Sequence, residues 1–89
     1  VPAEYSLKQN YPNPFNPETK FRFDIKQAGL VKLRVIDAAG KEISTLVNSQ
    51  LKAGEYEYNW NASNQPSGVY FYTLESGSYT ETRKMVLVK

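Results

Sequence analysis

The sequence predicts an all-β protein, an antiparallel Ig-like β-sandwich of about seven strands that forms one domain over residues 1–89. Three observations support this fold class. Apolar and polar residues alternate in several short segments, turn-forming residues recur about every 8 to 12 positions, and no segment has a helical period. Because a chain of this length can bury only a thin two-layer core, a second domain is not expected.

Six segments after residue 19 carry the strand pattern. In the first of them, Phe21, Phe23 and Ile25 alternate with charged residues, which predicts one buried face. In the segment 69–74 both faces carry apolar side chains, which predicts a central strand covered on both sides. The pattern also allows a short seventh strand at 6–9. The six segments are KFRFDI (20–25), VKLRVI (31–36), KEISTLV (41–47), EYEYNW (55–60), VYFYTL (69–74) and YTETRKMVLVK (79–89).

The composition excludes the commonest catalytic sites. The chain has no cysteine and no histidine, and this removes thiol nucleophiles, the usual zinc ligands and imidazole bases. Its carboxylates lie in turns or on the polar side of the predicted strands, with no cluster in an apolar pocket. We therefore expect no enzyme activity, no catalytic residue, no metal site and no cofactor.

The charge of the chain is nearly balanced. Eleven basic and nine acidic residues give a net charge of +2, too small for the dense cationic face that nucleic acid requires. The longest apolar run is only a few residues, so no segment is expected to span a membrane. The start at Val1-Pro2, without a methionine, leads us to expect a module excised from a longer protein.

Two surface features allow a functional interpretation as well as a structural one. The row Tyr56, Tyr58 and Trp60 could stack on sugar rings, but its opposite face is fully polar, which favours the row as part of the core. The segments 20–25 and 31–36, joined by a loop of hairpin length, would form a basic outer face that could meet an anionic surface. A solvated sheet face is the favoured interpretation. The basic residues are Lys20, Arg22, Lys32 and Arg34.

The segment QNYPNPFNPET, residues 9–19, is here called the proline arm. Each proline fixes its own φ angle and biases the preceding residue toward extended backbone, so the segment is neither a helix nor a central strand. We expect it to dock on the sandwich through two aromatic anchors, Tyr11 and Phe15. A flexible linker, or a P-x-x-P ligand formed by Pro14 and Pro17, are the alternatives.

The ordered set of these segments resembles a known family. The proline arm leading into KFRFDI is followed by VKLRVIDAAGKEISTLV, LKAGEYEYNW, SGVYFYTL and a terminal RKMVLVK. Together they resemble the C-terminal sorting domains of the type IX secretion system, type A, of Bacteroidetes and allied phyla. They are also similar to the Ig-like domain of the flagellar hook-capping protein, to which that family is related. The resemblance covers nearly the whole chain.

The resemblance implies that the domain is a sorting signal and not an enzyme. Such a domain follows a cargo domain in the same chain, and the outer-membrane export machinery recognises it after the protein has reached the periplasm. In many members a sortase then removes it, and the cargo is attached to the cell surface or released. The recognition residues that the resemblance implies are Pro12, Asn13, Pro14, Gly40, Lys41, Gly68, Tyr70, Lys84 and Lys89, the last two bounding the end segment.

Two other functions remain open at this stage. One is an accessory carbohydrate-binding or spacer β-sandwich of a secreted hydrolase, and the other is a hook-capping Ig-like domain. A partner could recognise the last strand by β-augmentation, in which it adds a strand of its own to the edge of the sheet. This requires that the edge is free.

Overall fold

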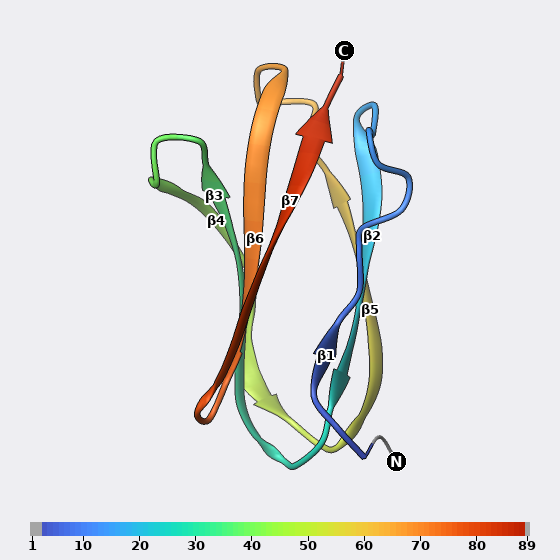
Figure 1. The fold of residues 1–89 in the computed structure, drawn as a ribbon, viewed down its shortest axis with the longest axis vertical. Helices are drawn as coiled ribbons and strands as arrows, with labels where there is room; N and C mark the ends of the chain where they lie inside the picture. Colours follow the sequence, from blue (N-terminus) through green and yellow to red (C-terminus); the bar gives the residue numbers. More distant parts are fainter. Residues whose placement is uncertain (1–2, 89) are drawn as a thin grey trace.

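The computed structural model describes residues 3–88, which form two antiparallel sheets packed face to face (Figure 1). The first sheet has the strand order β1-β2-β5, and the second has the order β4-β3-β6-β7. The described residues contain no helix, so the predicted all-β sandwich is confirmed. The strands are β1 (Ser6–Leu7), β2 (Glu18–Ile25), β3 (Gly29–Asp37), β4 (Glu42–Leu51), β5 (Gly54–Asn61), β6 (Gly68–Ser76) and β7 (Tyr79–Leu87).

The period-two pattern of the sequence decides which side chains enter the core. In β2 the three apolar residues are buried, and in β3 the same is true of Val31, Leu33 and Val35. The inner face of β2 packs across the sandwich against the inner faces of β3, β6 and β7, as in the contact of Phe21 with Tyr72. Removing so many large side chains from water supplies the main stabilisation of the fold. The buried apolar residues are Leu7, Phe15, Phe21, Phe23, Ile25, Val31, Leu33, Val35, Ala62, Tyr70, Tyr72, Leu74, Met85 and Leu87.

Strand β6 is central, as predicted, but only one of its faces is covered. It lies between β3 and β7, and its tyrosines Tyr70 and Tyr72 point into the core. On the opposite face Val69 is 38% exposed and Phe71 is partly exposed. The prediction that β6 is covered on both sides is wrong, because the described chain has no third layer outside this sheet.

The two basic segments do not form a hairpin. β2 pairs with β1 and β5, whereas β3 pairs with β4 and β6, so the loop between them crosses from one sheet to the other. Arg34 also forms ion pairs with Glu42 (3.1 Å) and Glu75 (2.7 Å), and Lys20 lies 3.6 Å from Glu57. The proposed basic face is therefore divided between two sheets and partly neutralised.

The two ends of the described chain lie far apart (Figure 1). The domain measures 36 × 23 × 17 Å along its principal axes, and the long axis separates the start of β1 from the end of β7. The β3–β4 turn, the start of β6 and the tip of the proline arm lie at the same end as the end of β7. Among the described residues, no helix is long and apolar enough to cross a membrane.

Candidate recognition surface at one end of the sandwich

Phe15 inserts the proline arm into the core. Its side chain is 1% exposed, and its ring lies 6.0 Å from that of Trp60. Its backbone forms a parallel bridge to Leu87, in which the Phe15 N–H donates to the Val86 carbonyl (3.0 Å) and the Val88 N–H donates to the Phe15 carbonyl (2.9 Å). The arm is thus held by packing and by hydrogen bonds, which a flexible linker would lack.

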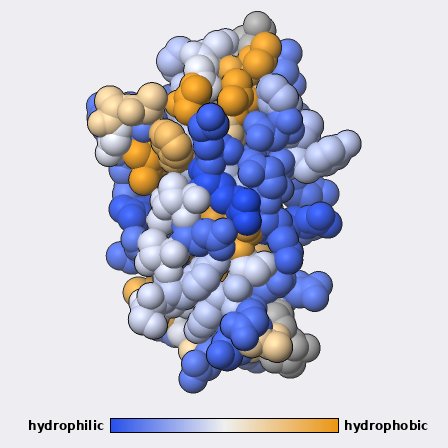
Figure 2. Space-filling view, in the orientation of Figure 1, coloured by the Kyte–Doolittle hydropathy of each residue, from blue (hydrophilic) through white to orange (hydrophobic). Residues whose placement is uncertain are grey.

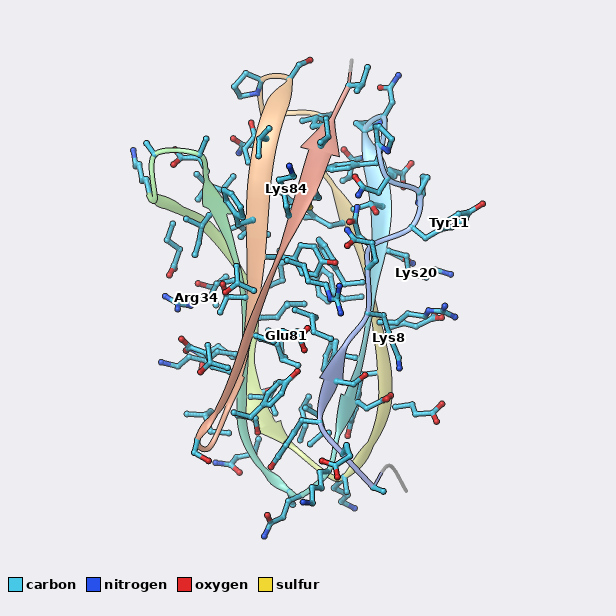
Figure 3. All side chains as sticks on the ribbon, viewed as in Figure 1. Lys8, Tyr11, Lys20, Arg34, Glu81 and Lys84 are labelled. Atoms are coloured by element: carbon cyan, nitrogen blue, oxygen red, sulfur yellow. The ribbon has the colours of Figure 1, made fainter. Side chains whose placement is uncertain are left out.

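Tyr11 is not an aromatic anchor. Its side chain is 78% exposed and points away from the sandwich (Figure 3). What holds this residue is its backbone, which exchanges two hydrogen bonds with Lys20, of 3.1 and 3.0 Å. The preceding residue, Asn10, is 2% exposed and takes the inward position. The prediction for Tyr11 is wrong because successive side chains of extended backbone point to opposite sides.

A buried polar network fixes the base of the arm, and we did not predict it. The Asn10 side chain donates to the Thr19 hydroxyl (2.9 Å) and to the Pro12 carbonyl (3.2 Å). The Tyr72 hydroxyl accepts a hydrogen bond from the Asn10 N–H (2.7 Å) and donates to the Lys8 carbonyl (2.8 Å). A sequence signal existed, since an asparagine beside a proline run often bonds nearby backbone, but its partner on β6 is 62 residues away.

Burial of Tyr72 has an electrostatic consequence. Removing its hydroxyl from water disfavours the phenolate and raises the pKa of Tyr72 to about 12, although the hydrogen bond from the Asn10 N–H opposes this shift. The side chain therefore stays protonated at physiological pH and keeps donating to Lys8. The link between β6 and the start of the arm is thus independent of ordinary changes in pH.

The arm also covers the outer edge of β7. Besides the two bonds of Phe15, the Asn13 side-chain oxygen accepts the Val86 N–H (3.0 Å), and the Gln9 side chain donates to the Lys84 carbonyl (2.9 Å). Strand addition at this part of β7 would require the arm to leave, so the edge is not free there. Pro12 and Pro14, on either side of Asn13, are both exposed.

The β3–β4 turn presents Lys41 at the same end of the molecule. Asp37 caps the turn, since its carboxylate accepts the N–H groups of Ala39 and Lys41, both at 2.9 Å. Gly40 has a φ of +88°, which only glycine adopts without strain. The turn leaves the Lys41 side chain exposed, with no ion pair to another described residue.

The start of β6 lies beside this turn. Gly68 has a φ of +152°, which L side chains rarely adopt, and it leads directly into the strand. The Tyr70 side chain is 4% exposed, and its hydroxyl donates to the Pro66 carbonyl at 2.5 Å. Burial, and to a lesser degree the nearby Asp37 charge, raise the pKa of Tyr70. Tyr70 therefore supports the loop before β6 and offers little surface to a partner.

The end of β7 alternates between core and surface. Met85 and Leu87 are buried, whereas Lys84 and Val88 are exposed. Lys84 has no ion pair within the part of the chain that the structure describes. Lys89 lies outside the described residues.

The segments just described are distant in sequence but lie at the same end of the molecule. The tip of the arm, the β3–β4 turn, the start of β6 and the end of β7 share one end of the sandwich (Figure 1). Of the predicted recognition residues that the structure describes, Tyr70 is buried and the others are exposed. We call this surface the motif end, and its exposed members are Pro12, Asn13, Pro14, Gly40, Lys41, Gly68 and Lys84.

The aromatic row of β5, formed by Tyr56, Tyr58 and Trp60, faces the core of the sandwich. Tyr56 stacks on Phe23 with ring centroids 5.6 Å apart, and Trp60 lies 6.2 Å from Phe21. The row is half-buried and packs against the core, while Glu55, Glu57 and Asn59 point outward. The feature that suggested carbohydrate binding is therefore part of the sandwich interior.

The described residues offer no group of three or more acidic, histidine or cysteine side chains that could hold a metal ion. A surface hollow of about 470 Å³ lies outside the first sheet, where the charges around it are mixed. It brings no nucleophile together with a base. The lining residues are Lys8, Arg22, Asp24, Glu55, Tyr56 and Glu57.

The fold defines a small β-sandwich module, and its described residues show no cluster suited to holding a metal ion. Comparison with known families identifies the family to which this module belongs. Residues 9–89 match the family model for the secretion system C-terminal sorting domain, and the chain belongs to that family.

Solved structures add a likeness of fold. The chain is similar to part of the crystal structure of dimeric latent PorU from Porphyromonas gingivalis, with a TM-score of 0.69 and 17% identity. The match covers 97% of this chain and 10% of the PorU chain, so this chain spans about a tenth of that protein. A search of curated proteins finds no match.

Family membership gives the function. The chain is a C-terminal sorting domain of the type IX secretion system, and it directs export across the outer membrane to the cell surface or the medium. This confirms the resemblance seen in the sequence. No observation favours a carbohydrate-binding spacer or a hook-capping domain. Domains of this family are generally non-catalytic.

Proposed function

We propose that the motif end is the surface by which the outer-membrane export machinery recognises this domain, while the cargo is joined at the opposite end. The observation that carries this proposal is the convergence of four distant segments on one end of the sandwich, away from the start of β1. Exposed residues on a rigid scaffold are suited to binding a partner protein. Without a cluster of catalytic side chains they are not suited to converting a substrate.

In this proposal the whole of residues 1–89 is one module that does no chemistry itself. The proline arm ties the first part of this module to its last strand, because Phe15 and Asn13 fasten the arm to β7. Any sortase that removes the domain would then cut before β1, on the cargo side. The recognition residues are the exposed members of the motif end, with Tyr70 as a buried support.

Deleting residues 84–89 would be a poor test, because Met85 and Leu87 are core residues and their loss would unfold the sandwich. Surface substitutions avoid this problem. We would append residues 1–89 to a periplasm-targeted reporter in a bacterium that has a type IX system. The test variant is Lys41→Glu with Lys84→Glu, and its matched control is Lys26→Glu with Lys52→Glu.

Both variants change the net charge from +2 to −2, since two lysines become two glutamates. All four lysines are exposed and lack ion pairs to other described residues, so neither variant should lose much stability. We expect the motif-end variant to lose at least about tenfold of its extracellular reporter, about 1.4 kcal/mol of recognition, and the control to be exported normally. Equal export of both variants would refute the proposal.

A further inference from the structure

The outer face of the second sheet has a group of apolar residues over which the described chain places no third layer. On β3, β6 and β7 most outward residues near the motif end are apolar, Lys84 being the exception on β7, and Figure 2 shows apolar side chains gathered at the upper end of the molecule. We call these residues the apolar patch. They are Ile36, Val69, Phe71, Val86 and Val88; Val69 is 38% and Val88 48% exposed, and the other three are partly exposed.

Strand register makes the patch continuous. Ile36 lies opposite Phe71, and Val69 lies opposite Val86, so these side chains are direct cross-strand neighbours on one face. Val88 follows Val86 on the same side of the chain, because alternate residues of extended backbone share a face. The patch therefore runs across the three neighbouring strands β3, β6 and β7 and reaches the β7 edge of the sheet.

The apolar patch is local and not a general property of the domain's surface. Further along the same outer face the residues are polar, among them Lys32, Arg34 and Glu75. The outer face of the other sheet is also polar, with Lys20 and Glu57 paired across it. Antiparallel sheets normally place polar residues on the solvent side, so the apolar patch near the motif end departs from the rule. Exposed apolar clusters with a polar rim are typical of interaction sites.

The charges around the patch indicate what chemistry would complete it. Lys84 lies opposite Phe71 on β7, and Lys41 extends from the neighbouring turn; both are exposed and unpaired within the described chain. The acidic side chain opposite Ile36, Glu42, already pairs with Arg34 at 3.1 Å. Asp37, in the same turn as Lys41, directs its carboxylate to the backbone N–H groups of Ala39 and Lys41. The outward side chains of the rim that lack a partner are therefore the two lysines, and a surface with an apolar centre and an acidic rim would complement them.

We propose that the apolar patch docks a protein of the export machinery through a surface that has an apolar centre and an acidic rim. This inference rests on the function proposed above and adds the outer face of β6 and β7 to the motif end. The patch supplies the desolvated centre of the contact, and Lys41 and Lys84 supply its orientation. Recognition then uses side chains of the sheet face, because the arm occupies the edge of β7.

The test replaces apolar with polar side chains of the same shape. Val69→Thr, Val86→Thr and Val88→Thr together keep the β-branched side chains that strands favour. Leu30→Thr is the control, since Leu30 is 47% exposed and lies at the start of β3, the strand end far from the β3–β4 turn. We expect at least a tenfold loss of extracellular reporter for the triple variant and no loss for the control. Thermal unfolding followed by circular dichroism verifies folding, and Val88→Thr alone keeps the test valid if the triple variant does not fold.

Other outcomes distinguish the two proposals and two rival occupants. Normal export of folded Val→Thr variants, with failure of the Lys41→Glu and Lys84→Glu variant, would overturn the patch and leave the motif end standing. Normal export of all of these variants would overturn both proposals. The patch as a machinery contact would also be overturned if the wild-type domain alone dimerised in light scattering and the triple variant did not. Binding of the wild-type domain, but not the variant, to phosphatidylglycerol vesicles would overturn it in favour of a lipid surface.

Discussion

Phe15 and Tyr11 show how differently two aromatic residues of one short segment behave. Both sit among prolines, yet one is a core residue and the other is 78% exposed. Sequence reasoning could identify the arm as stiff and docked, but it could not assign the inward positions, since Asn10 rather than Tyr11 fills one of them. A polar residue is a poor guess for a core site until its hydrogen-bond partners are known.

The two aromatics should therefore respond differently to truncation. Phe15→Ala removes a buried ring that contacts Trp60, so we expect the free energy of unfolding to fall by about 3–5 kcal/mol. Tyr11→Ala, the matched control, should change it by less than about 0.5 kcal/mol, because the side chain is exposed. Urea denaturation followed by tryptophan fluorescence measures both. A similar effect of the two substitutions would contradict the assignment of Phe15 as the anchor.

Tyr72 links the core to the arm, and its titration should be visible in stability. The folded state raises the pKa of Tyr72 from 10.0 to about 12, so the folded protein holds this proton more tightly than the unfolded chain does. The stabilisation is complete below pH 10 and is lost as the pH rises from about 10 to 12. Below that window, Tyr72→Phe should cost about 1–3 kcal/mol, because the Lys8 carbonyl and the Asn10 N–H lose their partner.

Equilibrium unfolding of wild type and Tyr72→Phe across pH 8 to 12 measures this effect. The difference between the two proteins should shrink above about pH 10, and a constant difference would show that Tyr72 titrates normally. Comparing the two proteins also cancels the contributions of Tyr70 and Tyr79, whose pKa values are raised as well.

At the scale of elements, the pairing of the arm with β7 matters most. The last strand ends a sheet, and an uncovered edge invites unwanted strand pairing. Here the arm occupies the edge from Lys84 to Val88 with backbone and side-chain hydrogen bonds. Proline-rich backbone is well suited to this task, since prolines lack the N–H groups that would continue a ladder outward. The sequence pattern could not predict this pairing, because alternation gives the faces of a strand but not its neighbours.

Asn13 offers a specific test of this pairing. Its side-chain oxygen accepts the Val86 N–H at 3.0 Å, so Asn13→Ala should expose that amide at a cost of about 1 kcal/mol. Hydrogen exchange of the Val86 amide, measured by NMR, should then become faster by about fivefold. The Phe15 amide, which donates to the Val86 carbonyl, should stay protected. Unchanged exchange at Val86 would mean that Asn13 does not cap the edge.

The loop between β2 and β3 shows another limit of sequence reasoning. Its length and its glycine fit a hairpin, but the chain passes from one sheet to the other. Both arrangements satisfy the same alternation of buried and exposed residues, and only packing of the two inner faces selects between them. The Asp37 and Gly40 turn was predictable, because a capping carboxylate and a glycine with positive φ act locally.

At the scale of the whole molecule, the fold places the motif end far from the start of β1. Fold class and family could be predicted from sequence, since alternating segments and an ordered set of motifs are readable along the chain. The motif end and the apolar patch could not, because they depend on which distant segments meet. Val69 and Phe71 gave the clearest hint, as apolar residues on the second face of β6, but they first suggested a covering layer within this chain.

The most direct measurement of the central claim is the location of a periplasm-targeted reporter with and without residues 1–89 at its C-terminus, in a bacterium that has a type IX system. The account predicts that the bare reporter stays in the periplasm and that the appended reporter reaches the cell surface or the medium. Loss of this transfer in a strain without the type IX machinery would tie it to that route. An appended, folded reporter that remained in the periplasm of the intact strain would contradict the account.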